Sequence, residues 1–379
     1  MNLYLYLRHF PPQGDRFNEG LTKAVHGLAS GLVECGASVT VLCEASATET
    51  SVHQSAAGYK IHCFVQPIQH RPSFTLSPEL RQFLRQLDRP SLVILNGILH
   101  PSVYAMSRLL RRQKVPYIIA PHDPYNPAIF KKNAHLKLPY WYLLEKRMLN
   151  RARAVQVLDP RHEQWLRQLG VHSAVIATPN GFATEDVVVE AEAGAIDRDP
   201  VRLFFLGRIE TYNKGLDLLL DAFAQVKQQH PVQLTLQGPD WGDRATLEAQ
   251  AAQLGMAEHV TFLPPDYDKS PALLAAHHDI FCIPSRFEGF SMAALEAMLA
   301  GRVLLVSEIA GIAPYVQASD CGVVVQPTVE GIRQGIGELL QRRSQWHAMG
   351  QRGRWYALEH LQWDKIAATA LKHYQQLVS

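Results

Sequence analysis

Two glutamates spaced eight positions apart are candidates for chemistry in the stretch PSRFEGFSMAALEAMLAG at residues 284–301. Glu288 stands directly before Gly289, where a predicted buried strand gives way to a predicted helix. Free backbone N–H groups at a helix N-terminus attract anions and suit phosphate, and a glycine lets a ligand approach the backbone closely. Glu296 lies about two turns into the helix, on roughly the same face. Its carboxylate can bind a vicinal diol such as a ribose, and Glu288 can accept bonds from a sugar hydroxyl.

Two cations upstream point to the same chemistry. In FLGRIETYNKGLDLLLDAF (205–223), Arg208 follows a predicted strand and Lys214 precedes a predicted helix, both at the strand edge that carries Glu288. An arginine and a lysine that converge beside a helix N-terminus form a clamp for a diphosphate and stabilise its charge as it leaves. Two plainer readings stay open. The cations can be solvated loop residues, and the two glutamates can be a dipole-stabilising acid and an exposed helix residue.

The first half of the chain offers polar residues after two further predicted strands. His122 and Asp123 stand between prolines in IIAPHDPYNP (118–127), and Asn96 ends the preceding strand in LNGILHP. A histidine held rigidly in such a loop can hydrogen-bond a sugar or assist a proton transfer, and Asn96 can contact an acceptor. The chain has 17 histidines, so a purely structural role for His122 is the alternative.

The elements that must position these residues alternate in both halves. Short β-branched runs separated by helical patterns predict parallel sheets with crossover helices, one sheet in each half. We expect an α/β protein of two doubly wound, Rossmann-like domains that bind ligands beyond the carboxyl ends of their strands, in the cleft between the domains. The predicted strands are 3–7, 38–43, 92–95, 117–120, 154–158 and 174–178, then 202–207, 233–238, 260–264, 280–284, 303–307 and 322–326.

Length and composition fit this division. A chain of 379 residues with 47% apolar and 19% charged residues suits two soluble domains. The predicted domains are 1–185 and 200–360, joined by the acidic segment 185–200, and a C-terminal helix at 361–379 is expected to pack on the first domain. Five cysteines without a CxxC pair indicate reduced thiols in a cytoplasmic protein. The N-terminal apolar run is too short for a signal sequence, and no run approaches a membrane span.

The net charge of +2 conceals two halves of opposite sign. Residues 1–180 carry 21 Lys and Arg against 11 Asp and Glu, a net of +10, whereas the rest carries 16 against 24, a net of −8. In the basic half, FKKNAHLKLPYWYLLEKRMLNRAR (130–153) interleaves cations with aromatic and leucine side chains. This composition suits the inner face of an anionic membrane; the alternative is a helix that packs on the sheet with solvated cations. No motif of nucleic-acid recognition accompanies the charge.

These motifs together resemble family-4 type retaining glycosyltransferases, which use nucleotide sugars and have the GT-B fold of two Rossmann-like domains facing a central cleft. The resemblance runs from the His122 loop through LLEKRMLNRARAVQVLDP (143–160) to the end of the second domain, well over half the chain. Its most specific element is the Arg…Lys-Gly pair followed by Glu-Gly-Phe-Ser, the Glu-x7-Glu spacing and EAMLAG. The chain departs from the family after the first strand, where the usual Gly-Gly loop is replaced by RHFPPQGDRFNEG (8–20), so acceptor binding is expected to differ.

The resemblance implies a role for each matching position. Arg208 and Lys214 hold the donor diphosphate together with backbone N–H groups of residues 289–291. Glu288 contacts the transferred sugar, Glu296 the ribose, and His122 the sugar near its anomeric carbon. The base lies beside the loop after VTFLP. The predicted catalytic residues are His122, Arg208, Lys214 and Glu288; the predicted donor-binding residues are Gly14, Arg208, Lys214, Pro264, Glu288, Gly289, Phe290, Ser291 and Glu296; and the predicted acceptor-binding residues are Phe17, Asn96, His122 and Asp123.

We therefore predict a retaining hexosyltransferase that needs no metal and no cofactor. The donor is by default UDP-glucose, with GDP-mannose as its competitor, and the acceptor is a glycan or lipid-linked saccharide in exopolysaccharide or surface-polysaccharide synthesis. The enzyme is expected in the cytoplasm, with peripheral contact to the inner face of the plasma membrane as a further hypothesis. The resemblance of the chain to this family implies that the leaving phosphate assists deprotonation of the acceptor, so no protein nucleophile is required.

Several other functions would use some of the same residues. A sugar-nucleotide epimerase or a phosphorylase on this fold would bind phosphate groups through the same kind of residues. A non-catalytic carbohydrate-binding relative does not need a clamp for a leaving diphosphate. A nicotinamide dehydrogenase requires a G-x-G-x-x-G after the first strand, which is absent. A metal-dependent sugar transferase requires an Asp-x-Asp, and the two matches, DYD (266–268) and DRD (197–199), lie after a second-domain strand and in the predicted linker.

Overall fold

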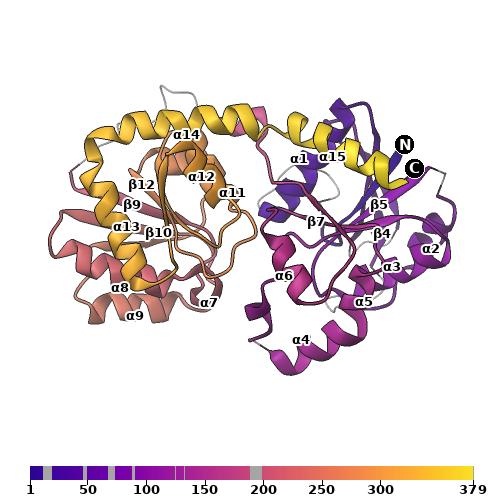
Figure 1. Cartoon of the computed structure of the whole chain (residues 1–379), viewed down its shortest axis with the longest axis horizontal. Coiled ribbons are helices and arrows are strands. Elements are labelled where there is room, and N and C mark those ends of the chain that lie inside the picture. The colour runs from indigo at the N-terminus through magenta and orange to yellow at the C-terminus, as the bar shows by residue number, and fades with distance from the viewer. Residues whose placement is uncertain are drawn as a thin grey trace. The chain divides into compact units, whose positions relative to one another are not determined.

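The chain folds into two units (Figure 1). Unit 1 comprises Met1–Gly181 together with the C-terminal segment from Trp363, and unit 2 comprises Phe182–Gln362. The computed structural model describes residues 1–11, 19–45, 49–66, 73–87, 90–123, 125–131, 133–187 and 199–378. Most of the predicted linker at 185–200 lies outside the described residues. Within those residues, no helix is both long and apolar enough to cross a membrane.

Unit 1 is built on a sheet of eight strands in the order β3-β4-β2-β1-β5-β6-β7-β8. All neighbouring strands are parallel except β3, which pairs antiparallel with β4 at one edge. The six strands predicted for this half are present, whereas β3 and β4 were not predicted. The bounds are β1 Asn2–Tyr6, β2 Ser38–Ala45, β3 Ser51–Gln54, β4 Lys60–Val65, β5 Ser91–Asn96, β6 Tyr117–Ala120, β7 Ala154–Val157 and β8 Ala174–Ala177.

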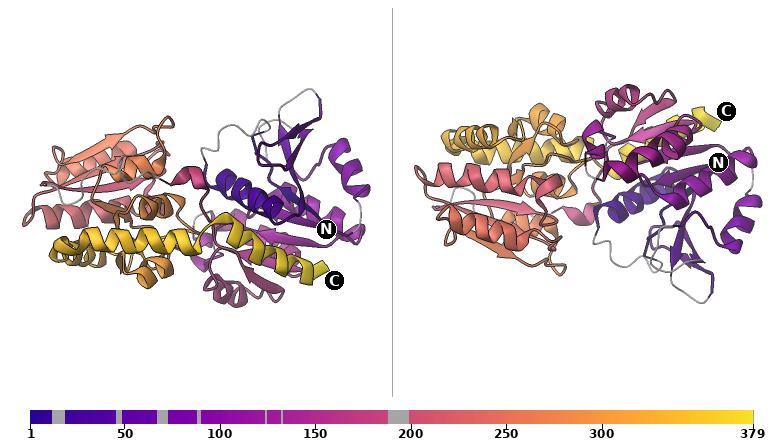
Figure 2. Two further views of the ribbon diagram at one scale, coloured as in Figure 1. Left: turned by 90° about the horizontal axis from the view of Figure 1, so that it is seen from above. Right: turned by 90° about the horizontal axis from the view of Figure 1, so that it is seen from below.

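Helices cover both faces of this sheet (Figures 1 and 2). The C-terminal helix α15 packs against α1, where a side chain at Gly27 would meet the Trp363 ring and one at Gly31 the Trp363 carbonyl. The stretch from α4 to α5 is one continuous helical segment with a π-helical turn, η2, in its middle. The bounds are α1 Gly20–Glu34, α2 Pro78–Arg85, α3 Pro101–Arg112, the 3-10 turn η1 Pro127–Phe130, α4 Ala134–Tyr140, η2 Trp141–Glu145, α5 Lys146–Leu149, α6 His162–Gln168 and α15 Trp363–Val378.

Unit 2 contains six parallel strands in the order β11-β10-β9-β12-β13-β14. All six were predicted, because strands buried on both faces read as unbroken apolar runs. The order places β12 directly beside β9, although more than seventy residues separate them in the chain. The bounds are β9 Val201–Leu206, β10 Val232–Gln237, β11 Val260–Leu263, β12 Ile280–Ile283, β13 Val303–Ser307 and β14 Gly322–Val325.

The helices of unit 2 also form two layers (Figure 1). One buried cluster joins α8, α9 and α13 to the sheet. The bounds are the 3-10 turn η3 Thr184–Asp186, α7 Thr211–Lys214, α8 Leu216–Lys227, α9 Arg244–Gln253, α10 Pro271–Ala276, α11 Met292–Leu299, α12 Ala313–Ser319, α13 Val329–Gln341, the 3-10 turn η5 Arg343–Gln345 and α14 Trp346–His360.

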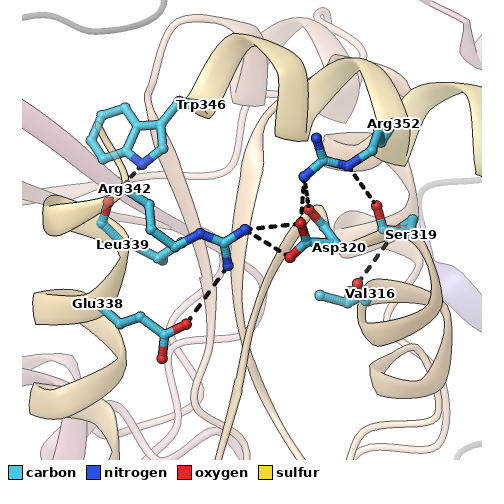
Figure 3. A network of polar contacts seen from close by, with 8 residues as sticks. All are labelled: Val316, Ser319, Asp320, Glu338, Leu339, Arg342, Trp346 and Arg352. Carbon is cyan, nitrogen blue, oxygen red and sulfur yellow. Dashed lines mark hydrogen bonds and ion pairs between the residues drawn. The ribbon is translucent and has the colours of Figure 1, made fainter. Parts of the chain in front are cut away.

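A polar network ties three of these helices together (Figure 3). Asp320 ends α12 in the left-handed conformation (φ 47°). Its carboxylate accepts hydrogen bonds from Arg342 after α13 at 2.7 and 2.9 Å and from Arg352 of α14 at 2.6 Å. Arg352 also donates to the Asp320 carbonyl at 2.8 Å. Because these contacts precede β14, they brace the amino edge of the sheet and leave its carboxyl edge to the loops described next.

Candidate functional site

The carboxyl ends of β9 and β12 bring two of the predicted loops together. Strand β9 is followed by Gly207–Gly215 and strand β12 by Pro284–Ser291, and the two strands are neighbours in the sheet. Loops after adjacent parallel strands lie at the same edge, which is where open α/β sheets bind ligands. We call this edge of unit 2 the donor edge, after the donor-binding role that the sequence predicts for its residues.

Lys214 and Glu288 form a direct ion pair at the donor edge. The distance from Lys214 Nζ to Glu288 Oε2 is 2.7 Å, and the two side chains are 15% and 12% exposed. The Ser285 hydroxyl donates a second hydrogen bond to the same carboxylate oxygen at 3.2 Å. The pair is therefore mostly withdrawn from solvent, and each side chain keeps a small exposed fraction. A diphosphate can reach the Lys214 ammonium there, and a sugar hydroxyl can reach the Glu288 carboxylate.

Arg286, which the sequence reasoning missed, holds the two loops in register. Its guanidinium binds the Asp217 carboxylate through two bonds of 2.8 and 2.7 Å and donates to the Thr211 carbonyl at 2.9 Å. The backbone N–H of Arg286 donates to the Asn213 carbonyl at 2.8 Å. A bidentate arginine–carboxylate pair fixes geometry as well as charge. Its signal in the sequence was its position two residues before Glu288, in the same loop.

The N-terminus of α11 lies directly after Glu288. The Ser291 hydroxyl caps the helix by accepting a hydrogen bond from the Ala294 N–H at 3.2 Å. The Phe290 ring is buried and packs edge-on against Tyr315 at 5.9 Å, so only its backbone can serve a ligand. Glu296 is 2% exposed. An exposed helix glutamate, one of the plainer readings of the sequence, is therefore excluded, and its predicted contact with a ribose stays a prediction.

Arg208 lies at the donor edge but contacts a different partner from Lys214. Its guanidinium sits over the Trp241 ring, 4.3 Å from the centroid, in a cation–π contact. Trp241 is 60% exposed in the loop after β10, and its backbone N–H donates to the Ile209 carbonyl at 3.1 Å. Trp241 was not predicted as a site residue; its signal in the sequence was a tryptophan between two glycine-containing turns after a strand.

Pro264 lies at the carboxyl end of β11, the outermost strand on one side of the sheet. It follows β11 and is exposed, and its carbonyl accepts a hydrogen bond from Gln237 Nε2 at 3.2 Å. Gln237 ends the neighbouring strand β10, so this bond ties the two strand ends together. The predicted contact of the Pro264 region with a nucleotide base stays a prediction.

In unit 1, the structure joins two predicted residues. His122 Nε2 lies 2.7 Å from Asn96 Oδ1, and Asn96 Nδ2 donates to the Tyr6 carbonyl at 3.1 Å. Because the Asn96 amide nitrogen donates to the Tyr6 carbonyl, the amide oxygen Oδ1 must accept the bond from His122. His122 Nε2 must therefore carry the proton. Burial lowers the pKa of His122 to about 4, so the ring is neutral near pH 7. Its Nδ1 is then an acceptor for a hydroxyl.

The conformation of His122 is unusual for a non-glycine residue. Its φ is 62°, in the left-handed region, where such residues concentrate at functional sites. Asp123 follows it and is exposed. We call the ends of β5 and β6, with Asn96 and His122, the acceptor edge, after the acceptor-binding role that the sequence predicts for these two residues. Gly14 and Phe17, also predicted for substrate binding, lie outside the described residues.

The two edges offer anion binding and hydroxyl recognition. Lys214, Glu288 and the start of α11 combine a cation, a carboxylate and free N–H groups, which suits a phosphorylated sugar. In the described ranges, no group of three His, Cys, Asp or Glu side chains is placed to hold a metal ion. Burial raises the pKa of Cys282 to about 12, so that thiol is not a nucleophile at neutral pH.

Sequence comparisons match both units to known families. Residues 19–181 match the family model described as a glycosyl transferase 4-like domain, and residues 189–355 match glycosyl transferases group 1. An MMP alpha-(1->4)-mannosyltransferase of Mycolicibacterium hassiacum is 30% identical over 181 residues, 47% of this chain and 44% of that protein. A phosphatidyl-myo-inositol mannosyltransferase of Mycobacterium tuberculosis is 27% identical over 58% of this chain and 62% of its own. The chain thus spans about half the length of the curated relatives it matches.

Solved structures match almost the whole chain. Sucrose-phosphate synthase from Thermosynechococcus elongatus is 19% identical with a TM-score of 0.79, covering 99% of this chain and 98% of that one. Anabaena HepE in complex with UDP and glucose is 15% identical with a TM-score of 0.74, covering 99% and 100%. At these identities the similarity establishes the fold, which is the predicted GT-B fold.

Proposed function

Because the chain belongs to the group 1, family 4-like glycosyltransferases, we propose that it transfers a hexose from a nucleoside diphosphate sugar to a saccharide acceptor. The observation that carries this proposal is the Lys214–Glu288 pair, 2.7 Å apart and mostly buried, at the entrance to α11. A structural ion pair needs neither a helix N-terminus nor a glycine beside it. A diphosphate ester needs a cation and N–H donors for its charge, and its sugar needs a hydroxyl acceptor.

The proposed reaction retains the configuration of the sugar and needs no metal. The bond from the anomeric carbon to the β-phosphate oxygen breaks, and a bond from the same carbon to the acceptor oxygen forms on the same face. The acceptor proton passes to the leaving phosphate oxygen, so no protein nucleophile is used. Lys214 and the N–H groups of residues 289–291 stabilise the leaving diphosphate, joined by Arg208 when it turns from Trp241.

His122 acts in this proposal through hydrogen bonding. A pKa of about 4 makes its ring a weak base at neutral pH. Its neutral Nδ1 instead accepts a bond from a hydroxyl of the transferred sugar or of the acceptor. Asn96 supports this role, because its side chain fixes the His122 tautomer through the 2.7 Å bond.

The donor is proposed to be a UDP-hexose, with glucose as the default. A structural neighbour in complex with UDP and glucose supports this choice. Sequence relatives named as mannosyltransferases favour mannose as the hexose, which makes GDP-mannose the second candidate. For the acceptor we propose a glycan or lipid-linked saccharide in exopolysaccharide or other surface-polysaccharide synthesis.

A thermal-shift screen of UDP, GDP, ADP and their sugar forms, with and without EDTA, tests the proposal. A ligand at about 100 times its Kd stabilises the native state by roughly 2.7 kcal/mol, or roughly 5–10 °C in Tm for a unit of this size. We expect one base to give this shift equally with EDTA. Product analysis then separates the alternatives: an epimerase yields a changed sugar nucleotide and a phosphorylase a sugar phosphate. A chain that no nucleotide stabilises refutes the proposal.

A surface of unit 1 suits contact with an anionic membrane, and we include this contact in the proposal. The α4 patch consists of exposed apolar side chains along one helical segment and the loop beside it. The Phe74 ring stacks on Tyr140 at 6.3 Å and meets Tyr104 at 6.0 Å, with Arg108 over the Tyr104 ring. The patch residues and their exposed fractions are Phe74 51%, Leu136 64%, Leu138 37%, Tyr142 62% and Leu143 58%.

Cations border the α4 patch and favour an anionic partner. Lys131, Arg108 and Arg147 are exposed beside it. Apolar side chains framed by cations bind a bilayer whose headgroups are anionic. We expect the protein to sediment with phosphatidylglycerol vesicles and not with phosphatidylcholine vesicles. Replacing Leu136 and Leu143 by serine should abolish sedimentation, whereas Trp355→Ser in unit 2, where the ring is 68% exposed, should not. Wild-type protein that stays in the supernatant with anionic vesicles contradicts the contact.

A further inference from the structure

Glu145 is a buried carboxylate with an unusual backbone setting. It ends the π-helical turn η2 and is 0% exposed. Its Oε1 accepts two hydrogen bonds, from the Tyr125 hydroxyl at 2.5 Å and from the Leu99 N–H at 2.9 Å. Its Oε2 has no hydrogen-bond partner among the described residues. A single π-helical turn is rare and is frequent at functional sites, and a buried, partly satisfied carboxylate is costly to keep.

The two donors to Glu145 come from the two loops of the acceptor edge. Leu99 lies three residues after Asn96, and Tyr125 lies three residues after His122. The beginnings of these loops are joined by the bond between His122 and Asn96. Oε1 of Glu145 joins the same two loops a second time, through Leu99 and Tyr125. The two loops are therefore joined at two places, by the His122–Asn96 bond and by Glu145.

Each loop also contains a residue in the left-handed conformation, Leu99 with φ 50° and His122 with φ 62°. Such residues persist only where the surrounding structure imposes the conformation. The turn at Leu99 aims its N–H at Glu145, and the turn at His122 aims its ring at Asn96. Two strained loops that share one buried anchor indicate an arrangement that must be held in place.

We propose that Glu145 is a positioning residue for the acceptor edge, which braces the loops after β5 and β6 so that Asn96 and His122 meet the substrate in one fixed geometry. The proposal rests on the proposed function for its role in catalysis. Glu145 does not itself touch the reacting atoms. Burial raises its pKa to about 7, so the carboxyl group is protonated below that pH and becomes the charged, stronger acceptor for both loops only above it.

The ionisable groups that face Glu145 do not compete with it between pH 5 and 8. Among the described residues they are Tyr125 and Tyr140, and burial raises the pKa of both. Burial lowers the pKa of His100, in the first of the two loops, to about 4. The pKa of His122 therefore reports whether the two loops keep their positions, because its low value depends on burial of the ring.

The experiment is a pH titration of the histidine Cε1–H resonances by NMR, with the His122 signal assigned from its absence in His122→Gln. Tyr125→Phe and Glu145→Leu should loosen the loops and raise the pKa of His122 from about 4 toward its ordinary 6.5. Glu145→Gln keeps an acceptor oxygen and should keep the low value. Tyr374→Phe is the matched control, because Tyr374 is an equally buried tyrosine that donates to Gln156 at 2.5 Å on another element.

Two further readouts connect the brace to the reaction. Loss of one hydrogen bond at the acceptor edge should slow hydrolysis of UDP-glucose about tenfold in Tyr125→Phe, while the Kd for UDP stays within about twofold, since UDP binds to unit 2. An unchanged His122 pKa in folded Tyr125→Phe and Glu145→Leu overturns the brace. A chain that binds no nucleotide refutes the proposed function instead, and the NMR titration still decides the inference about Glu145.

Discussion

Gly215 allows the sharpest test of how the donor edge is assembled. It separates α7 from α8 with φ 65°, and a Cβ there would lie 2.4 Å from the Pro284 carbonyl oxygen. Gly255 has nearly the same conformation, φ 72°, and open space around the Cβ position. Alanine at either position pays for a left-handed backbone, about 1 kcal/mol. Only alanine at Gly215 must also push two backbone segments apart, because ordinary contact begins near 3.4 Å.

The magnitudes follow from this difference. A shift of about 1 Å in a packed backbone costs roughly 1–3 kcal/mol, so Gly215→Ala should lower the free energy of unfolding of unit 2 by roughly 2–4 kcal/mol. Gly255→Ala should lower it by about 1 kcal/mol. In Tm these correspond to losses of roughly 5–12 °C and roughly 2–4 °C. The displaced carbonyl belongs to the loop that carries Glu288, so Gly215→Ala should also weaken binding of UDP, whereas Gly255→Ala should not.

Urea unfolding followed by fluorescence gives both stabilities, and calorimetry gives the two Kd values. Equal destabilisation by the two alanines would show that the clash is relieved without cost. A large destabilisation of Gly215→Ala with unchanged UDP affinity would show that the Lys214 and Glu288 loops need not meet for binding. Either result refutes the reasoning that their contact forms the donor edge.

Four further substitutions test the packing and the charges. Gly31→Ala should destabilise unit 1 by about 1–2 kcal/mol, because its Cβ would lie 2.5 Å from the Trp363 carbonyl, whereas Gly337→Ala in the open middle of α13 should stabilise unit 2 by roughly 0.5–1 kcal/mol; thermal unfolding checks both. Asp320→Asn keeps the left-handed cap but loses the charge, and should cost about 1 kcal/mol at low salt and less in 1 M NaCl. The raised pKa of Glu145 means that its folding contribution is complete below about pH 4.5 and is lost as pH rises to about 7. The stability of Glu145→Gln relative to wild type should therefore rise by about 3 kcal/mol over that window, and a flat difference contradicts the shift.

The sheets were largely predictable because parallel strands buried on both faces have a plain signature. Twelve apolar runs separated by helical patterns fixed the two sheets and the edge that carries each loop. Strands β3 and β4 escaped because SVHQ and KIHCFV place histidines among the apolar residues, and β3 is a half-exposed edge strand. The antiparallel pairing of β3 with β4 was equally invisible, since it depends on tertiary contact.

The residues at the donor edge could be predicted by type, whereas their pairings could not. Lys214 and Glu288 meet because β9 and β12 are neighbours in the sheet, and strand order is not written in local sequence. The same adjacency pairs Arg286 with Asp217, whereas the adjacency of β9 and β10 brings Trp241 beside Arg208. In each case the missing information is which loops lie side by side.

Burial set the remaining limits of the sequence reasoning. The position of Glu296 on its helix was predicted, but its 2% exposure depends on the elements packed around α11. Glu145 drew no attention, because a glutamate within a basic, aromatic stretch resembles a solvated residue. Its enclosure by Tyr125, Leu99 and the π-helical turn appears only in the folded chain.

The central claim is that Lys214 binds the terminal phosphate of a nucleoside diphosphate at the donor edge. The most direct test is calorimetry of UDP and UMP, or GDP and GMP if guanine is preferred, on wild type, Lys214→Met and the control Lys269→Met, whose side chain is 55% exposed. One charge-assisted hydrogen bond supplies roughly ten- to a hundredfold in affinity. The account predicts that UDP binds that much more tightly than UMP, and that only Lys214→Met brings the two affinities together. Equal loss of UDP and UMP binding, or an unchanged preference for UDP, would contradict it.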